Sequence, residues 1–297
     1  TDSLATLLKG YGYETRAFHP GERTSWQRNI AYPRLGFDSF KCGEDMDVPQ
    51  TEEHGYVSDD SDFEQIIWEF EHKDESTPLF LFNVTIQNHG SYTVEDYPAE
   101  VQVADEPGVY PKAEQYLTLA NKTDEAFKKL IDYFSAQTEP TILVMFGDHQ
   151  PSVEQEFLDK AYGVTQDEMT MAQYMDKFKV PFIIWANYPL TGDSTKITSL
   201  NFLAQYVLRN AGIETSVYGK YLWNLQKTIP AMTFAGYFDS EGNAYSHLDT
   251  TKFTPLIEDY ERVQYNNLFG GDERQTALFV SPASATSSDA ANATSGN

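Results

Sequence analysis

The chain has 297 residues, of which 40% are hydrophobic and 14% aromatic, so it holds enough apolar material for a sizeable core. Its 45 acidic and 21 basic residues give a formal net charge of −24, which excludes nucleic acid as a partner of the general surface. The same charge opposes an anionic membrane surface, so an anionic substrate needs a local cation. The single cysteine, Cys42, excludes an internal disulfide.

Four apolar segments predict strands that are buried on both faces, because they lack the polar alternation of a half-exposed strand. These segments are residues 13–18, 78–86, 141–146 and 180–186. Helical patterns separate them. Helices are expected after a cap at Asp2 or Ser3, and over residues 61–72, 116–137 and 199–212. This alternation is typical of an α/β fold with a mostly parallel central sheet and helices on both faces.

The alternation ends in the C-terminal part of the chain. The turn sequence "EGN" within residues 216–271 predicts a hairpin, so we expect these residues to form a small β-rich subdomain. The α/β core then comprises residues 1–215. Residues 272–297 are expected to form a disordered tail, because they end in a long stretch without apolar periodicity, "SPASATSSDAANATSGN".

Polar side chains follow three of the predicted strands where each strand ends. His19 follows the first and His89 the second, whereas Asp148 and His149 both follow the third. Ligands bind at the carboxyl ends of parallel strands in open α/β sheets, so we expect these side chains to meet at one rim. Asp148 and His149 are then candidate ligands of a divalent metal, and His19 and His89 face its substrate.

Each of these residues also has a structural explanation. An Asp-His pair ahead of Pro151 is typical turn chemistry, and a lone histidine more often makes a structural hydrogen bond. Three such sites at the same end of separate strands have no structural reason to coincide, which favours the functional interpretation. The histidines in polar surroundings are expected to be structural: His54, His72 and His247.

Two residues that follow the first histidine suit an anionic ligand. Arg28 can hold a phosphate by two parallel hydrogen bonds, and Trp26 can cover a glycerol-like group beside it. The structural alternatives are packing for Trp26 and a surface ion pair for Arg28. The sequence contains no Gly-rich phosphate loop, G-x-S-x-G elbow, H-E-x-x-H or C-x-x-C motif that would indicate another chemistry.

Four motifs carry a family resemblance. In order and spacing, "YGYETRAFHPGERTSWQRNIAYPRLGFDSF", "PLFLFNVTIQNHGSY", "MFGDHQPSV" and "VPFIIWANY" resemble the extracellular catalytic domain of the lipoteichoic acid synthase and phosphoglycerol transferase family. These enzymes are sulfatase-like members of the alkaline phosphatase superfamily, so the resemblance implies that superfamily's α/β fold. It extends from about residue 3 to about residue 225.

The resemblance implies a protein of the bacterial cell membrane, anchored by an N-terminal segment, with its catalytic domain on the extracellular side. A divalent metal, most often Mn²⁺ and alternatively Mg²⁺, helps a threonine attack the phosphodiester of phosphatidylglycerol. The glycerophosphate group then passes to a glycopolymer or glycolipid acceptor during synthesis of the cell envelope. Asp148 and His149 match two metal ligands of the family. The family's substrate-binding positions are matched by His19, Trp26, Arg28 and His89.

One departure from the family concerns catalysis. In the family the nucleophilic threonine and a metal-binding acid precede the matched segment, so we expect this chain to hold half a metal site, no nucleophile and no activity of its own. Two ligands alone would bind the metal weakly or leave the site empty. A sulfatase or phosphodiesterase on the same scaffold, and a non-catalytic binding module, are the alternative interpretations.

Overall fold

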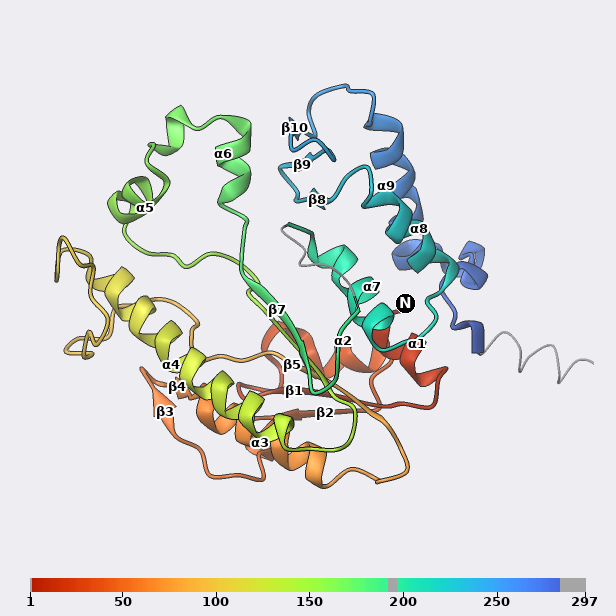
Figure 1. Cartoon of the computed structure of the whole chain (residues 1–297), viewed down its shortest axis with the longest axis horizontal. Helices are drawn as coiled ribbons and strands as arrows, with labels where there is room; N and C mark the ends of the chain where they lie inside the picture. The colour runs from red at the N-terminus through yellow and green to blue at the C-terminus, as the bar shows by residue number, and fades with distance from the viewer. Residues whose placement is uncertain (1, 192–196, 284–297) are drawn as a thin grey trace, which may run out of the picture.

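The centre of the fold is a three-stranded parallel sheet in the order β2-β1-β5 (Figure 1). The computed structural model describes residues 2–191 and 197–283. Strand β1 (Glu14–His19) pairs in parallel with β2 (Ser39–Cys42) on one side and with β5 (Leu79–Asn83) on the other. The α/β fold predicted from the sequence is confirmed, and β1 lies in the middle of its sheet.

One face of this sheet is covered by α3 (Asp59–Glu71), which lies beside α4 (Pro111–Ser135). Ser58 caps α3 by accepting a hydrogen bond from a backbone N–H of its first turn, as expected for a serine at this position. A short antiparallel ribbon of β3 (Glu52–Glu53) and β4 (Tyr56–Val57) leads into α3. Both long helices contain the residues whose apolar spacing predicted them, but α3 begins two residues and α4 five residues before the predicted starts at residues 61 and 116.

The opposite face is covered by α1 (Leu4–Lys9) and α2 (Arg28–Arg34). Phe80 of β5 packs in a cluster with the apolar residues of α1, and Tyr32 of α2 lies edge-on to Phe82 with ring centroids 6.2 Å apart. Helices therefore lie on both faces of the sheet, as predicted. Three short 3₁₀ helices in the connections are η1 (Ser25–Gln27), η2 (Gly43–Asp45) and η3 (Gln166–Glu168).

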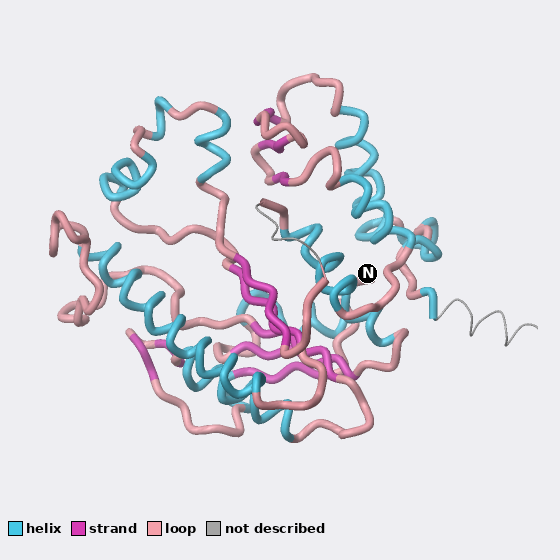
Figure 2. The backbone as a smooth tube through the Cα atoms, viewed as in Figure 1, coloured by secondary structure: helices cyan, strands magenta, loops and turns pink. Residues whose placement is uncertain are grey.

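The third and fourth predicted strands form a separate two-stranded ribbon, drawn in magenta above the parallel sheet in Figure 2. Strand β6 (Ile142–Phe146) pairs with β7 (Phe182–Ala186), and the pairing is antiparallel. The expectation of parallel strands is therefore wrong for β7. The connection through α5 (Gln155–Tyr162) and α6 (Met171–Asp176) leaves and re-enters the ribbon at the same end, where the last residue of β6 faces the first of β7.

The C-terminal unit, blue in Figure 1, contains the predicted small sheet but is flanked by helices. Strands β8 (Ala231–Met232), β9 (Gly236–Phe238) and β10 (Ala244–Ser246) are antiparallel, and the hairpin predicted between the last two is confirmed. Helices α8 (Val217–Leu225) and α9 (Thr254–Phe269) supply most of the apolar residues that pack against this sheet. The unit is thus more helical than the sequence indicated.

Helix α7 (Leu200–Asn210) joins the two parts of the molecule. Its residue Phe202 packs in the core of the C-terminal unit, whereas Leu208 packs against Leu7 and Leu8 of α1. The apolar core of the C-terminal unit therefore begins before the boundary expected at residue 215. No helix in the described part of the chain is long and apolar enough to cross a membrane.

The first residues of the expected tail are folded. Two 3₁₀ helices, η4 (Gly271–Glu273) and η5 (Thr276–Leu278), follow α9, and Phe279 is 97% buried, with 3% of its surface exposed. Arg274 forms an ion pair with Asp2 near the start of the chain. Residues 272–283 therefore belong to the folded unit, and residues 284–297 lie outside the described residues.

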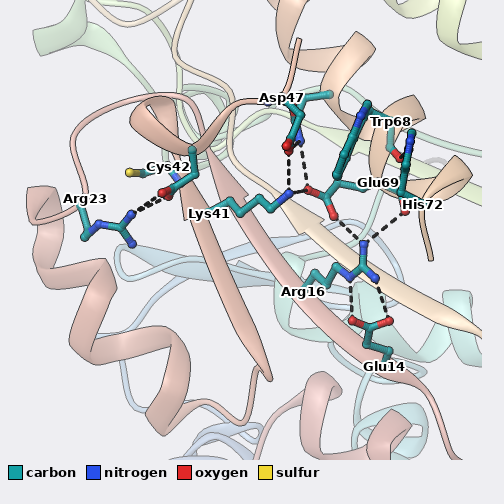
Figure 3. A network of polar contacts seen from close by, with 11 residues as sticks. Glu14, Arg16, Arg23, Lys41, Cys42, Asp47, Trp68, Glu69 and His72 are labelled. Atoms are coloured by element: carbon teal, nitrogen blue, oxygen red, sulfur yellow. Dashed lines mark hydrogen bonds and ion pairs between the residues drawn. The ribbon is translucent and has the colours of Figure 1, made fainter. Parts of the chain in front are cut away.

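A buried ion network connects the central strands to α3 (Figure 3). The carboxylate of Glu69, of which 2% is exposed, accepts hydrogen bonds from Arg16 of β1 at 2.6 Å and from Lys41 of β2 at 2.8 Å. Glu14 binds the other side of the Arg16 guanidinium, and Asp47 binds Lys41 at 2.7 Å. The network stabilises the position of α3 against β1 and β2, because each buried charge has a partner of opposite sign.

Removing Glu69 from this network should cost about 2 kcal/mol in free energy of unfolding, because Arg16 and Lys41 would each lose one of their two carboxylate partners. We expect this loss for Glu69→Ala, measured by urea denaturation. Glu64→Ala on the exposed side of the same helix is the control and should change the stability by less than about 0.5 kcal/mol. Equal losses in the two variants would contradict a structural role for the network.

Candidate functional site

His19 is the last residue of β1 and is 2% exposed. Its Nδ1 lies 2.7 Å from the carbonyl oxygen of Val84, to which a neutral ring donates. Burial lowers the pKa of His19, and the charges of Arg28 and His89 lower it further, against the opposing effect of the Val84 carbonyl. The ring is therefore neutral at pH 7 and presents Nε2 as a hydrogen-bond acceptor.

The chain leaves β1 in a tight loop that is fastened to the end of β2. Gly21 lies so close to His19 that a Cβ atom there would be 2.5 Å from Nε2. The Gly21 carbonyl accepts a hydrogen bond from the backbone N–H of Gly43. Arg23 binds both carboxylate oxygens of Asp45, at 2.7 and 2.5 Å (Figure 3). This loop therefore holds the imidazole and the residues that follow it in a fixed relation.

The loop after β5 is held from two sides through Gln87, which is 2% exposed. Its side-chain oxygen accepts from the backbone N–H of Asp59 in α3, and its amide nitrogen donates to the Leu119 carbonyl and the Thr123 hydroxyl of α4. The ring of His54 contacts the Gln87 carbonyl, which confirms the structural role expected for that histidine. Gln87 could not be identified from the sequence, because the role of a buried glutamine is known only from its hydrogen-bond partners.

His89 is carried by this loop and is exposed. Its Nδ1 lies 2.8 Å from the Gly90 carbonyl oxygen and 3.4 Å from the hydroxyl of Tyr56. Its charge contributes to the lowered pKa of His19, which places the two imidazoles within electrostatic range of each other. Two of the three sites predicted to meet at the rim are therefore together.

Two buried carboxyl groups lie beneath this loop at the start of α3. Asp59 and Asp62 are 0% exposed, and they bind the Thr123 hydroxyl and the Asn83 amide, respectively. Burial raises the pKa of Asp59 to about 6. Burial, together with the charge of Asp59, raises the pKa of Asp62 well above its usual value. In the described structure one oxygen of each lacks a hydrogen-bond partner, so neither carboxylate is fully compensated for its burial, which agrees with the raised pKa of both groups.

The pair Asp148 and His149 follows β6 and faces solvent, with 82% and 77% of the two side chains exposed. The carboxylate oxygen Oδ2 and the imidazole Nε2 are 3.6 Å apart. Burial, then the charges of Tyr116 and Asp148, raise the pKa of Tyr92 to about 12. Since the Tyr92 hydroxyl donates to the carbonyl of Asn88, Asp148 lies within electrostatic range of the loop that carries His89.

These two side chains fit a divalent metal in donor type. A carboxylate oxygen and an imidazole nitrogen are ligands that Mn²⁺ and Zn²⁺ both accept, and both side chains are exposed to solvent. Among the described residues, however, no third histidine, cysteine or acid completes a group that could hold a metal. The pair therefore accounts for part of a coordination shell.

Arg28 and Trp26 lie on opposite sides of the segment that opens α2. Arg28 is half-buried, donates to the Ser25 carbonyl and bonds to the buried Tyr32, and its charge acts on His19. The ring of Trp26 is 84% exposed and lines a groove on the outer side of α2. The structure thus brings Arg28, His19 and His89 together and leaves Trp26 turned to solvent.

The central parallel sheet thus carries an imidazole at the carboxyl end of β1, with a guanidinium and a second imidazole within electrostatic range, at the edge where open α/β sheets bind ligands. The family model described as "Sulfatase" matches residues 1–213. The chain therefore belongs to the sulfatase family.

Individual relatives agree with this assignment. The chain is 28% identical to a putative cyclic beta-1,2-glucan modification protein of Rhizobium meliloti, over 90% of this chain and 43% of that protein. It is 26% identical to the lipoteichoic acid synthase-like YvgJ of Bacillus subtilis, over 60% of this chain and 28% of that protein. The chain thus spans less than half the length of both relatives. The resemblance to the lipoteichoic acid synthase-like members of the family is confirmed.

A solved structure shares the fold. The chain superimposes on the phosphoglycerol transferase GacH of Streptococcus pyogenes, in complex with sn-glycerol-1-phosphate, with a TM-score of 0.69 and 18% identity. The match covers 91% of this chain and 65% of the other. At this identity the similarity shows a common architecture.

The buried Asp59 should make the fold more stable as the pH falls from 7 to 5. The carboxyl is protonated in the fold below about 6, whereas in the unfolded chain it stays ionised down to about 3.8, so lowering the pH favours the folded state. The full difference between the two pKa values corresponds to about 3 kcal/mol, of which about 1 kcal/mol appears between pH 7 and pH 5. Asp59→Asn should flatten the dependence of unfolding free energy on pH.

The control for this variant is Asp124→Asn on the exposed side of α4, which changes the net charge equally. It should keep the pH dependence of the unmodified chain, including the part that comes from general repulsion among acidic residues. If Asp59→Asn and Asp124→Asn gave the same slope in urea denaturation between pH 5 and pH 7, Asp59 would not be the source.

Proposed function

We propose that the rim binds the glycerophosphate part of a phosphodiester, and that the chain belongs to a metal-dependent phosphoglycerol transferase that uses phosphatidylglycerol-type lipids in cell-envelope glycopolymer synthesis. The observation that carries this proposal is the neutral, buried His19 with Arg28 and His89 in electrostatic range at the end of β1. The glycerol phosphate in the complex of GacH, which has the same architecture, supports the choice of ligand.

The three side chains have complementary roles in this proposal. The guanidinium of Arg28 has no carboxylate partner among the described residues, so it can donate two parallel hydrogen bonds to a phosphate. The Nε2 of His19 accepts a hydrogen bond from a glycerol hydroxyl, because its other nitrogen is occupied by the Val84 carbonyl. His89, exposed beside them, can donate to a phosphate oxygen when it is protonated.

Asp148 and His149 would hold a divalent metal, Mn²⁺ or alternatively Mg²⁺. When bound, such an ion neutralises the phosphodiester charge and activates an attacking hydroxyl. We propose that the remaining ligands and the nucleophilic threonine come from outside the described residues, since no third metal-binding side chain joins the pair there and both curated relatives are much longer. The described chain would then bind glycerol phosphate without releasing it from a lipid.

The same proposal includes a cellular location for the protein and an acceptor for the transferred group. The lipoteichoic acid synthase-like relative supports a membrane-anchored protein whose catalytic domain lies on the extracellular side, where phosphatidylglycerol is at hand. The group acceptor is proposed to be a glycopolymer or glycolipid. A hydrolase would pass the same group to water, so comparing release from phosphodiesters and from sulfate esters separates the transferase from a sulfatase.

Arg28→Lys should weaken binding of sn-glycerol-1-phosphate to this chain by about tenfold, because an ammonium cannot replace the two parallel hydrogen bonds of a guanidinium. Isothermal titration calorimetry measures the affinity. The control is Arg262→Lys, since Arg262 is 69% exposed and pairs with Glu258 and Asp259 on α9. Arg274 does not serve as a control, because it binds Asp2 and Asn267.

The affinity of the Arg262→Lys variant should equal that of the unmodified chain. Unchanged affinity after Arg28→Lys, or no detectable binding by the unmodified chain, would count against a glycerophosphate site at the rim.

A further inference from the structure

A stripe of three side chains, Trp26, Ile30 and Arg34, lies along the outer side of the α2 segment. Ile30 and Arg34 are four residues apart within α2 and so lie on one face of that helix, and Trp26, just before the helix, lines the same groove. Trp26 and Ile30 are 84% and 44% exposed, and Arg34 is exposed as well. We refer to these three residues as the α2 stripe. It consists of an aromatic ring, an aliphatic side chain and a cation in sequence.

The backbone presents the tryptophan of this stripe to solvent by an uncommon conformation. Trp26 and Gln27 have φ angles of 56° and 52°, so two successive residues with a Cβ lie in the left-handed region. Of the four tryptophans in the sequence, Trp26 is the one whose ring is largely exposed; Trp68, Trp185 and Trp223 are half-buried. A left-handed turn that holds a large apolar ring in water indicates that the ring has a partner.

The stripe borders a groove of about 650 Å³, whose floor includes Leu35. None of the residues that line this groove is acidic, although the chain carries 45 acidic residues. Of the seven arginines in the sequence, Arg28 and Arg34 have neither a carboxylate partner nor an aromatic ring beneath the guanidinium in the described structure. The groove is thus an apolar surface with an uncompensated positive charge.

A second apolar groove, on α9, shows the opposite charge. Tyr265 and Phe269 are 66% and 67% exposed there, and the groove has a volume of about 1070 Å³. Its lining includes Glu258, Glu261 and Glu273 against a single arginine. An anionic surface would be repelled from this groove, so the two grooves form a matched pair for an experiment.

We propose that the α2 stripe docks on the surface of an anionic phospholipid bilayer. Tryptophan favours the bilayer interface, an aliphatic side chain enters the apolar boundary, and a cation near the surface is attracted to anionic headgroups. This inference rests on the proposed function and deepens it. The segment that inserts Trp26 outward carries Arg28 inward to His19, so a headgroup can reach the rim while its acyl chains stay in the bilayer.

The net charge of −24 does not prevent this contact. At physiological ionic strength charges more than about 8 Å from the bilayer are screened, so the residues at the contact decide the sign of the interaction. At the groove these are cationic or neutral. Binding should therefore weaken at low ionic strength, where repulsion from the rest of the chain extends further. A surface made of basic residues throughout would instead bind anionic vesicles more strongly at low ionic strength.

The test is co-sedimentation of the chain with vesicles that contain phosphatidylglycerol, compared with vesicles of phosphatidylcholine alone. The unmodified chain should bind the anionic vesicles, with a blue shift of tryptophan emission as the ring of Trp26 leaves water. Ile30→Glu and Arg34→Glu should each lower the affinity at least about tenfold, since each places an acid at the contact. The controls are Phe269→Glu, in the acidic groove, and Lys112→Glu, an exposed site on α4; both should bind as the unmodified chain does.

Three results would overturn the inference: no binding of the unmodified chain to anionic vesicles, equal binding by Ile30→Glu, or vesicle binding lost equally in the Phe269→Glu control. Self-association that depends on Ile30 without vesicle binding, seen by analytical ultracentrifugation, would show that a second copy of the chain covers the stripe instead.

The failure of this inference can be told from failure of the proposed function. Ile30→Glu should leave the affinity for soluble sn-glycerol-1-phosphate unchanged, because Ile30 does not face His19. If glycerol phosphate binds and anionic vesicles do not, the docking surface is refuted and the rim stands. If vesicles bind through the stripe and glycerol phosphate does not bind, the stripe stands and the proposed function fails.

Discussion

The parallel pairing of β1 with both β2 and β5 is the constraint on which the rest of the structure depends. It brings the carboxyl ends of three strands to one edge, so the chain segments that leave them must emerge side by side. The contacts at that edge follow from it: His19 at the end of β1 reaches the Val84 carbonyl just beyond β5, and Gly43 just beyond β2 binds the loop after β1. The network around Glu69 keeps α3 on this sheet, and α3 in turn holds Gln87.

Much of this arrangement could be predicted from the sequence, because buried strands and amphipathic helices have periodic patterns. The strand that ends in His19 and the helix capped by Ser58 lie where those patterns placed them. The antiparallel direction of β7 could not be predicted in this way, since it depends on where the connection from β6 returns. The folded start of the expected tail was missed for a related reason, because Phe279 is buried by residues far from it in the sequence.

The candidate site likewise contains some residues that the sequence identified and others that it did not. The sequence identified His19, His89 and Arg28 as a group, because each follows or closely follows a strand end, and the structure places them within electrostatic range. It did not identify Gln87 or Asp59, whose importance lies in buried hydrogen bonds to other elements. It also assigned Trp26 to the rim, whereas its ring points into the groove outside α2. Spacing along the sequence predicts where a residue lies on the fold, whereas the local backbone conformation decides the direction in which its side chain points.

The central proposal is that His19, His89 and the Asp148-His149 pair form one rim that takes a divalent metal. The most direct measurement is an NMR titration of the six imidazole rings with substoichiometric Mn²⁺, which broadens signals steeply with proximity to the ion. The account predicts that the signals of His149 broaden first and those of His89 and His19 next. The signals of His72 and His247 should stay sharp. In the Asp148→Asn variant, this order of broadening among the histidines should be lost. Equal broadening of His247 and His149, or an unchanged order in Asp148→Asn, would contradict it.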